Sequence, residues 1–250
     1  RKGIKWFKKI LLDKYFKKEI KPLREEPENK LIDYLGWHKQ NKDYSFVGLP
    51  LLSGRLSGNK KSLIRDIVKE NDLDLRLTPN QDILLCNIHN KNKSKIKKAL
   101  IKVGYNDLNN INEIQRHALA CPALPLCGLA MTEAERILPE VLTRIENLLN
   151  ELNIEKTILF RMTGCPNRCT RPYMAELALV GSGQNKYQLW LGGSKNLQRL
   201  AKPYLQKMEL NDLEKTLQPL FDYWKSSSDM DFGDFINMQD ESSILNLLNE

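Results

Sequence analysis

The sequence predicts an α+β protein in which a small sheet domain precedes an α/β domain that carries four cysteines. Between about residues 32 and 104, the apolar pattern follows the order strand, helix, strand, strand, helix. From about residue 105 to 225, β-rich runs alternate with amphipathic helical runs, which favours an α/β sheet. Two pairs of cysteines lie in this second region, and one pair directly follows a predicted strand.

The elements of the first region are defined by β-rich runs and by turns at glycine and proline. An amphipathic helix is expected over residues 1–22, before a polar linker. The elements expected after the linker are a strand with turns over 43–56, a helix over 59–71, two strands over 73–88 and a helix over 93–105. The two strands are joined by a turn at Thr78-Pro79-Asn80, and the last helix ends at Gly104.

The second region begins with the strongest helical pattern of the chain, over 132–153. Thr132 and Glu135 form a capping-box pattern at its start, and Glu133 and Glu135 are interpreted as favouring its N-terminus. The elements expected after it are strands over 156–162, 175–183 and 186–194 and helices over 196–208 and 210–226. The acidic, Ser/Asp-rich tail after residue 225 is expected to be loosely ordered.

Composition excludes several classes of protein. The chain has 39 basic and 31 acidic residues, a net charge of +8, and its lysines concentrate at 1–30 and 90–102. These clusters are interpreted as solvated helix faces or as a surface that steers an acidic partner. Zinc-finger spacing and RNP-type aromatic motifs are absent, which argues against nucleic acid binding. No apolar run approaches the roughly 18 residues of a membrane span.

The N-terminal residues lack a signal peptide's apolar block, and the sequence does not begin with Met, so we expect a fragment or a processed chain. Five cysteines in 250 residues do not form a secreted disulfide framework; their pairing indicates a reducing compartment and a metal. Cys86 lies in an apolar run and is interpreted as a core strand residue. The three histidines are isolated in sequence and are interpreted as structural or exposed: His38, His89 and His117.

The other four cysteines are spaced as Cys121-x5-Cys127 and Cys165-x3-Cys169. Structural zinc sites favour about two to four residues between paired cysteines, so the first spacing fits zinc poorly. Four thiolates suit a [4Fe–4S] cluster, which uses one thiolate per iron. A zinc-stabilised binding module on the same cysteines stays open as an alternative of another class. Prolines between the cysteines indicate rigid loops, and Gly164 is interpreted as permitting a bulky cofactor to approach.

Several longer motifs carry a family resemblance. The run TGCPNRCTRPYMAELAL (163–179) resembles the signature of nitrite and sulfite reductases that contain sirohaem and a [4Fe–4S] cluster. ACPALPLCGLAMTEAER (120–136) resembles the sulfite reductase form, and YQLWLGG (187–193) resembles ferredoxin-dependent sulfite reductases in particular. LRLTPNQDILL (75–85) resembles the family's pocket strand, and DFGDF (231–235) resembles its C-terminal motif.

The resemblance implies a ferredoxin-like sheet domain followed by a sirohaem- and [4Fe–4S]-binding α/β domain. It implies that Cys121, Cys127, Cys165 and Cys169 hold the cluster and that Cys169 is also the axial sirohaem ligand. Further sirohaem contacts are expected from Arg76, Thr78, Asn80, Gln81, Asn167 and Arg171. An ordinary surface turn at 76–81 and a surface salt bridge at Arg171 stay open as alternatives.

The activity implied is the six-electron reduction of sulfite to sulfide with electrons from reduced ferredoxin, in a monomer of the cytoplasm or the plastid stroma. Ferredoxin–nitrite reductase is the alternative within the family. One position departs from the family pattern, because Arg168 stands where a small residue is usual. If that position needs a positive φ, Arg costs about 1 kcal/mol there; its side chain then crowds the haem edge or reaches a haem carboxylate.

The resemblance also implies that a first half is absent from this sequence. The family has two similar halves, each with a pocket strand, and only one such strand is found here. The expected organisation is a helical linker over 1–30, the half domain over 31–105, the cofactor domain over 106–225 and a tail over 226–250. No catalytic residue is assigned in this chain, because the family's sulfite-binding Arg and Lys side chains come mostly from the first half.

Overall fold

The computed structural model describes residues 2–16, 31–108, 111–226 and 229–248. The chain divides into two compact units, residues 1–30 and 31–250. Within the described ranges, none of the helices combines the length and apolar character that a bilayer-spanning segment needs.

In the first unit, α1 (Gly3–Leu11) continues into a π-helical turn at Leu12–Phe16. This confirms the helical expectation for residues 2–16; the expected continuation to residue 22 lies outside the described residues. None of its side chains is buried, and Ile4 and Phe7 are among the exposed apolar residues. Lysines lie between these apolar positions, which gives α1 two chemically distinct faces.

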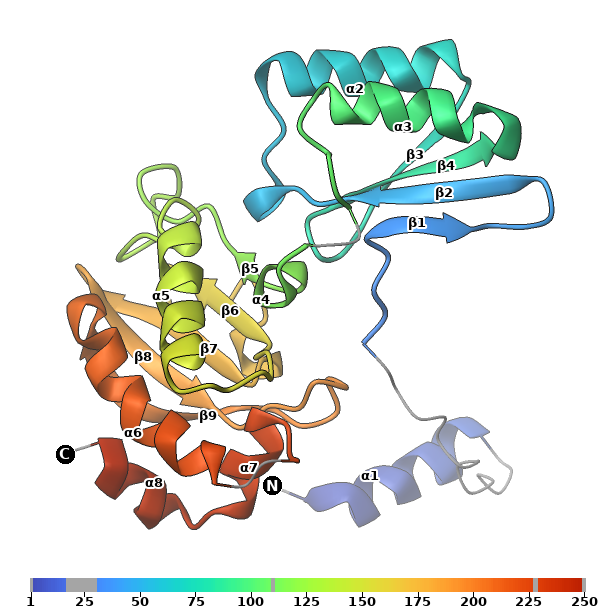
Figure 1. Cartoon of the computed structure of the whole chain (residues 1–250). Helices are drawn as coiled ribbons and strands as arrows, with labels where there is room; N and C mark the ends of the chain where they lie inside the picture. The colour runs from blue at the N-terminus through green and yellow to red at the C-terminus, as the bar shows by residue number, and fades with distance from the viewer. Residues whose placement is uncertain (1, 17–30, 109–110, 227–228, 249–250) are drawn as a thin grey trace. The chain divides into compact units, whose positions relative to one another are not determined.

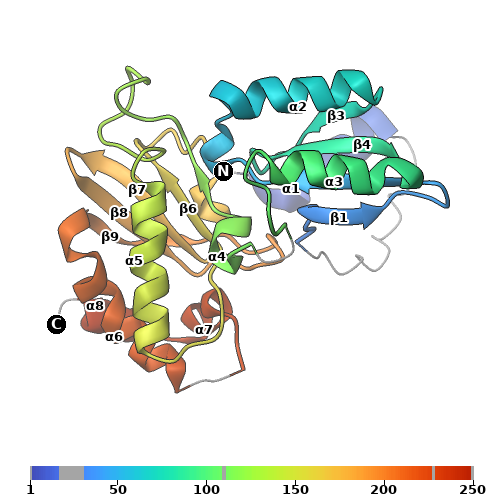
Figure 2. The same ribbon diagram turned by 45° about the horizontal axis from the view of Figure 1, so that its top comes forward.

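The second unit begins with a four-stranded antiparallel sheet whose strand order is β1-β2-β4-β3. Its strands are β1 (Gly36–Lys39), β2 (Tyr44–Leu49), β3 (Asp74–Leu77) and β4 (Ile83–His89). Helices α2 (Gly58–Glu70) and α3 (Lys93–Ile101) lie side by side over one face, as Figures 1 and 2 show. Side chains that alternate along the strands, such as Val47 and Leu85, pack against helix residues such as Ile96 and form the core between sheet and helices. The predicted strands and helices are confirmed, whereas the short β1 was not predicted.

The cysteine region folds around a five-stranded sheet with the order β5-β6-β7-β8-β9. Its strands are β5 (Leu119–Ala120), β6 (Phe160–Thr163), β7 (Leu177–Gly183), β8 (Lys186–Leu191) and β9 (Lys202–Glu209). The pairs β5–β6 and β6–β7 are parallel, and β7–β8 and β8–β9 are antiparallel. The helices are α4 (Glu113–Arg116), α5 (Leu138–Glu151), α6 (Leu213–Lys225), α7 (Phe232–Met238) and α8 (Glu241–Leu248).

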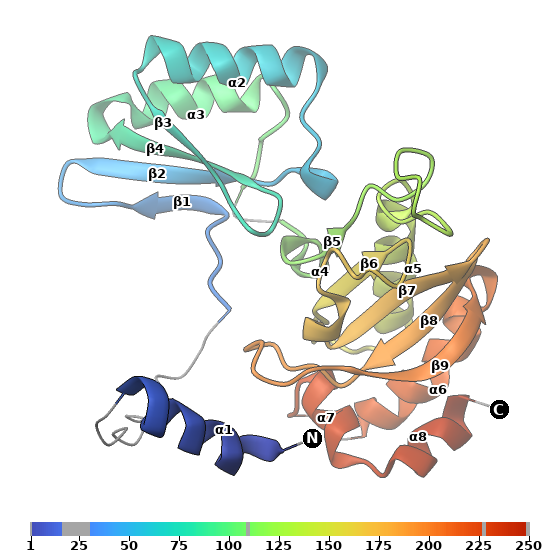
Figure 3. The ribbon, with the colours of Figure 1, turned by 180° about the vertical axis from the view of Figure 1, so that it is seen from behind.

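The two faces of this sheet differ. Phe160 and Met162 of β6 pack with residues of α5 and α6 in one large core. Leu159, Ala178 and Trp190 belong to a separate, smaller cluster. Figure 3 turns this second face toward the viewer, with α5 behind the sheet. Residues from outside the strands pack on this second face, among them Leu31, Tyr173 and Leu197.

The capping box predicted at Thr132 and Glu135 is wrong. Helix α5 begins at Leu138, with Pro139 in its first turn, where the missing backbone N–H costs nothing. Thr132 Oγ1 instead contacts the Tyr187 hydroxyl at 3.0 Å, and the carboxylate of Glu135 pairs with Arg55. Glu133 pairs with Arg136, so neither glutamate lies at the helix N-terminus.

Two further predictions for the C-terminal region are wrong. The helix predicted over 196–208 is not formed; residues 202–209 form strand β9, in which Pro203 pairs opposite Trp190 at the outer edge of the sheet. Proline cannot donate in a helix interior but is tolerated in an edge strand. The tail predicted as loosely ordered contains α7 and α8, because Phe232 packs edge-on against Phe221 and Trp224 of α6.

Candidate metal and cofactor site

Two neighbouring parallel strands deliver the two cysteine pairs to one edge of the second sheet. Ala120 of β5 pairs opposite Met162 of β6, so both strands end at the same edge. Cys121 follows β5 directly, and Cys165 lies two residues beyond the end of β6. The prediction that the cysteine loop lies at a strand's carboxyl end, where α/β folds place ligands, is confirmed.

The loops that follow these strands pack closely against each other. Gly164 O accepts hydrogen bonds from Met131 N at 2.8 Å and from Thr132 N at 3.2 Å. A Cβ atom on Gly164 would lie 2.5 Å from Ala123 Cβ, which is not sterically possible without a shift. The glycine was interpreted as making room for a cofactor; the structure shows instead that it makes room for the loop of the other cysteine pair.

The four thiols converge on this region with different exposure. Cys121 and Cys165 are buried, Cys127 is half-buried and Cys169 is exposed. Cys121 Sγ accepts a hydrogen bond from Gly164 N at 3.3 Å and contacts Thr163 Oγ1 at 3.3 Å. Burial raises the pKa of the Cys169 thiol, and the other three cysteines raise it further. Cys86 lies apart on β4, buried in the first sheet as predicted.

The chemistry of this donor set fits a [4Fe–4S] cluster. In the ranges that the structure describes, no group of three or more His, Cys, Asp or Glu side chains is arranged around a single metal-ion position. A cluster that binds one thiolate per iron does not require the four sulfurs to meet at one point. Two pairs of thiols on neighbouring loops are therefore a suitable starting arrangement for it.

Arg168 occupies the position where the family pattern has a small residue. Its φ is +58°, so the backbone at this position adopts the positive φ considered above, which costs Arg about 1 kcal/mol. Its guanidinium carbon lies 4.5 Å from the centre of the Trp190 ring, a cation–π contact that offsets this cost. The side chain thus rests on the Trp190 ring, and both outcomes expected from the sequence, which concern the haem, stay predictions.

The predicted pocket turn lies against the cysteine loops. Thr78 Oγ1 accepts hydrogen bonds from Asn80 N at 3.3 Å and Asp82 N at 3.1 Å, which fixes the turn. Gln81 Nε2 donates to Ala120 O, the carbonyl directly before Cys121, at 3.0 Å. Gln81 Oε1 is buried without a hydrogen-bond partner among the described residues. An orphaned acceptor beside the cysteine loops is a polar group that a ligand with a donor could satisfy.

The two cationic candidates are engaged with protein groups. Arg171 Nη2 donates to Pro79 O at 3.1 Å, which joins the loop after Cys169 to the pocket turn. This contact replaces the surface salt bridge considered for Arg171. Arg76 is exposed on β3, with its Nη2 atom 3.8 Å from Asp74 Oδ2. Asn167 is exposed in the loop between Cys165 and Cys169. The structure thus brings Gln81, Arg171 and the four cysteines together but leaves Arg76 at a sheet edge.

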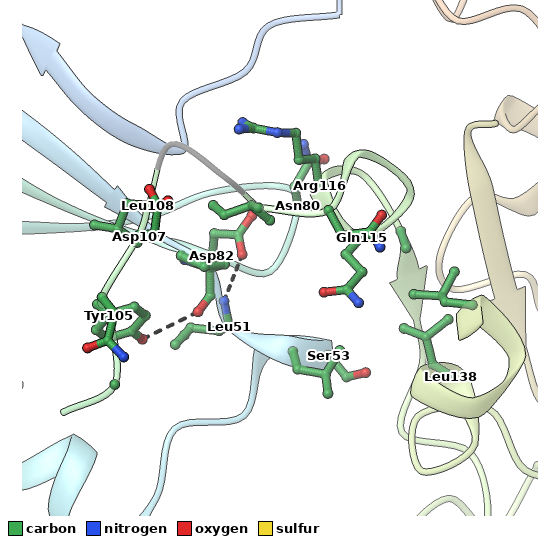
Figure 4. Close-up of a pocket in the computed structure, with 18 of the residues that line it drawn as sticks. Leu51, Ser53, Asn80, Asp82, Tyr105, Asp107, Leu108, Gln115, Arg116 and Leu138 are labelled. Carbon is green, nitrogen blue, oxygen red and sulfur yellow. Dashed lines mark hydrogen bonds between the residues drawn. The ribbon is translucent and has the colours of Figure 1, made fainter. Parts of the chain in front are cut away.

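A cavity of about 530 Å³ lies near the same turn, and the cysteines do not line it (Figure 4). Asp82 Oδ1 accepts a hydrogen bond from Leu51 N at 2.9 Å, and the Tyr105 hydroxyl donates to Pro50 O at 3.3 Å. Burial raises the pKa of Asp82 to about 6. Sequence reasoning missed this buried carboxylate; its position directly after the pocket turn, before an apolar strand, was the available signal.

The chain is similar to proteins named as sulfite reductases and to a family model of one domain. Residues 38–103 match the family model described as the nitrite/sulfite reductase ferredoxin-like half domain. Over 240 residues, 93% of this chain, the sequence is 47% identical to "Sulfite reductase [ferredoxin]" of Synechococcus elongatus, covering 38% of that protein. It is 35% identical over 245 residues to "Sulfite reductase [NADPH] hemoprotein beta-component" of Staphylococcus carnosus, covering 94% of this chain and 42% of that one.

The fold also matches a solved structure, the Mycobacterium tuberculosis NirA protein. The TM-score is 0.77 at 21% sequence identity, over 97% of this chain and 47% of the other. This likeness supports the α+β fold across both sheets. In all three comparisons, the chain spans less than half the length of the protein that it matches.

Proposed function

Because the chain belongs to the nitrite/sulfite reductase family, we propose that it is the cofactor-binding portion of an enzyme that reduces sulfite to sulfide. The observation that carries this proposal is that the two cysteine pairs follow neighbouring parallel strands, which end at the same edge of the second sheet. The relatives at 47% and 35% identity are both named as sulfite reductases, which favours sulfite over nitrite as the substrate. Assaying both anions on the full-length enzyme distinguishes the two.

In this proposal Cys121, Cys127, Cys165 and Cys169 hold a [4Fe–4S] cluster. Cys169 is the most exposed of the four, which suits an additional role as a ligand of the sirohaem iron. When bound, the two centres would supply single-electron transfer, and reduction of sulfite to sulfide takes six electrons. The chain's own residues position them: Gln81 and Arg171 tie the pocket turn to the cysteine loops, and Thr78 holds the turn in shape.

The remaining expected sirohaem contacts, Arg76, Asn80 and Asn167, stay proposals. So does the division of the chain into a linker, a half domain, a cofactor domain and a tail. Location in the cytoplasm or the plastid stroma and a monomeric state also belong to the proposal.

The ligand roles are tested by comparing Cys169→Ser with Cys86→Ser in the full-length enzyme. We expect Cys169→Ser to lose iron, acid-labile sulfide and the sirohaem Soret absorption, because one sulfur serves both centres. Cys86→Ser should keep all three, because Cys86 is a core residue of β4. Equal loss in both variants, or in neither, would contradict the assignment. Zinc in place of iron in the wild type would favour the zinc-stabilised module.

Reduced ferredoxin is proposed as the electron donor, on the basis of the relative that is named for it. Five of the six lysines of the 90–102 cluster are exposed on and around α3, Lys93 is half-buried, and the whole chain carries a net charge of +8. Electrostatic steering weakens as the Debye length falls from about 30 Å at 0.01 M salt to about 10 Å at 0.1 M. Ferredoxin-dependent turnover should therefore fall with ionic strength more steeply than turnover with a small artificial donor. If both turnover rates fall in parallel as the ionic strength rises, the lysines contribute to solubility and do not steer ferredoxin.

A further inference from the structure

Arg161 places a cation in the interior of the second sheet. Its strand neighbours Phe160 and Met162 point into the helix-covered core, so Arg161 lies on the opposite face, with Leu159. The side chain is only 1% exposed. Its Nη1 atom donates to the Arg171 carbonyl at 3.2 Å, whereas its Nε atom is buried without a partner. No carboxylate of the described residues forms an ion pair with it.

A buried guanidinium without a counter-ion is unfavourable, because burial removes its hydration and nothing replaces the lost charge stabilisation. Burial lowers the pKa of Arg161 to about 10, and the neighbouring positive charge of Arg171 adds to this effect. Buried charges in proteins are normally paired. The surroundings of Arg161 therefore lack a negative charge that would compensate its guanidinium.

His117 supplies a second unsatisfied group, two residues before Leu119, which pairs opposite Arg161 across β5 and β6. Its Nδ1 atom is buried and has no hydrogen-bond partner among the described residues. Burial lowers the pKa of His117; Arg116 and Arg161 lower it further, while Asp33 and Glu113 act in the opposite direction. Both of these carboxylates pair with Arg116. The β5–β6 register thus brings the backbone of His117 close to that of Arg161, and among the described residues no carboxylate forms an ion pair with either side chain.

We propose that Arg161 and His117 form a buried subsite for an oxyanion of the carboxylate type, bordered by Arg171. The planar guanidinium presents a fork of N–H donors that matches such an anion, and the His117 ring adds a donor when its Nδ1 atom is protonated. The anion has two possible sources. One is a free oxyanion such as sulfate; the other is a side-chain carboxylate of the tetrapyrrole, and only this second source rests on the proposed function.

The sequence carried a signal for this site. Arg161 interrupts the apolar run TILFRM, where a strand buried on both faces reads as continuously hydrophobic. A charged residue at such a position needs a specific partner, and the sequence around it offers none.

The test uses the whole chain and follows the histidine ring signals by NMR. The chain has three histidines, so His117→Gln identifies the signal of His117. Sodium sulfate is added at constant ionic strength, with chloride as the balancing ion, and the metal-free tetrapyrrole is added in a second series. The variants are Arg161→Met, Arg161→Lys and, as a matched control, Arg65→Met on the exposed face of α2.

We expect a saturable shift of the His117 signal with at least one of the two ligands. Arg161→Met should weaken the binding of that ligand at least tenfold, and Arg161→Lys should weaken it less. Arg65→Met should bind the ligand like the wild type. A shift with the tetrapyrrole that sulfate suppresses identifies the carboxylate source; a shift with sulfate alone identifies the free oxyanion. The proposal is overturned if neither ligand shifts His117 in the wild type, or if the affinity is unchanged in Arg161→Lys and in any folded Arg161→Met.

Discussion

Glu176 joins three separate parts of the chain through one buried carboxylate. It is fully buried at the start of β7, and its two oxygens accept hydrogen bonds from Leu159 N at 2.8 Å and Gly233 N at 2.9 Å. Burial raises its pKa to about 7, although both hydrogen bonds and Lys195 act to lower it, and Asp231 adds to the increase. Burial removes water from the Glu176 carboxylate, and its two hydrogen bonds hold the residues before β6 and β7 against the start of α7.

This arrangement predicts a pH-dependent stability. Because the folded-state pKa of about 7 exceeds the ordinary 4.5, the folded protein holds the proton more tightly. The contribution of Glu176 is fully present below pH 4.5 and is lost as the pH rises to about 7, by an amount of about 3 kcal/mol. Asp82, whose pKa is also raised, acts in the same direction.

Thermal unfolding of Glu176→Gln at pH 5 and pH 8 checks this prediction. The variant should lose much of the decline in stability that the wild type shows between these pH values. The exposed Glu151→Gln on α5 is the matched control and should behave like the wild type. An undiminished decline in Glu176→Gln would assign the pH dependence to other groups.

At the level of elements, the DFGDF segment shows how the C-terminal helices are attached. Gly233 lies so close to the turn after β8 that a Cβ atom on it would be 1.7 Å from Gly193 O. Asp231 pairs with Lys195, and Asp234 pairs with Arg199, on either side of this contact. The motif was recognised in the sequence only by resemblance; the structure gives its physical reason, a close backbone approach flanked by ion pairs.

Gly233→Ala should therefore displace α7 and destabilise the fold by about 3 kcal/mol. Gly183→Ala is the matched control, because a Cβ there meets only Lys186 side-chain atoms, 3.8 Å away or farther. Chemical denaturation followed by tryptophan fluorescence measures both variants, since Trp224 packs against Phe232 with ring centres 5.1 Å apart. Equal stability of the two variants would contradict the role given to this contact.

Three of the strands that sequence reasoning predicted correctly have apolar runs that match their burial, whereas β3 was predicted correctly although all four of its residues are exposed. The runs that became β2, β4 and β7 bury most of their side chains, and their apolar character was sufficient. The strand β9 was mistaken for a helix because most of its side chains are exposed, so burial did not impose a period of two. The order in the tail depends on Phe232 and Phe235 meeting α6, a tertiary contact that local composition does not encode.

The position of the cysteine loops was predictable from the sequence, whereas the contacts that support these loops were not. The cysteine spacing and the strand before Cys165 indicated a metal site at a sheet edge. The contacts of Gln81 with Ala120 and of Arg171 with Pro79 join residues 39 and 92 positions apart, which no local pattern can show. Arg161 was visible as an anomaly in an apolar strand, but its lack of a partner required the structure.

At the scale of the whole molecule, apolar side chains are exposed at two places near the cysteine loops. Leu75 and Leu77 are 44% and 80% exposed on β3, the last strand of the first sheet. Leu126 and Leu129 are 68% and 72% exposed in the loop that contains Cys127. Apolar groups in such numbers indicate surfaces that another part of a protein covers. The chain spans 38% of the length of its Synechococcus relative, so the remaining length can supply such a cover.

The isolated chain should therefore not reduce sulfite efficiently, even if it assembles a cluster. In the proposed enzyme, sulfite would bind as an anion beside a polyanionic tetrapyrrole and would need converging cations, whereas Arg76 faces Asp74 and Arg171 donates to the Pro79 carbonyl. Chain reconstituted with sirohaem, iron and sulfide, and supplied with a strong chemical reductant, should produce sulfide at least about 100-fold more slowly than full-length enzyme. The full-length Cys86→Ser variant controls for the assay. Turnover of the isolated chain near the full-length rate would show that these residues suffice to bind and protonate sulfite, and that the remainder of the relatives' length is dispensable for the chemistry.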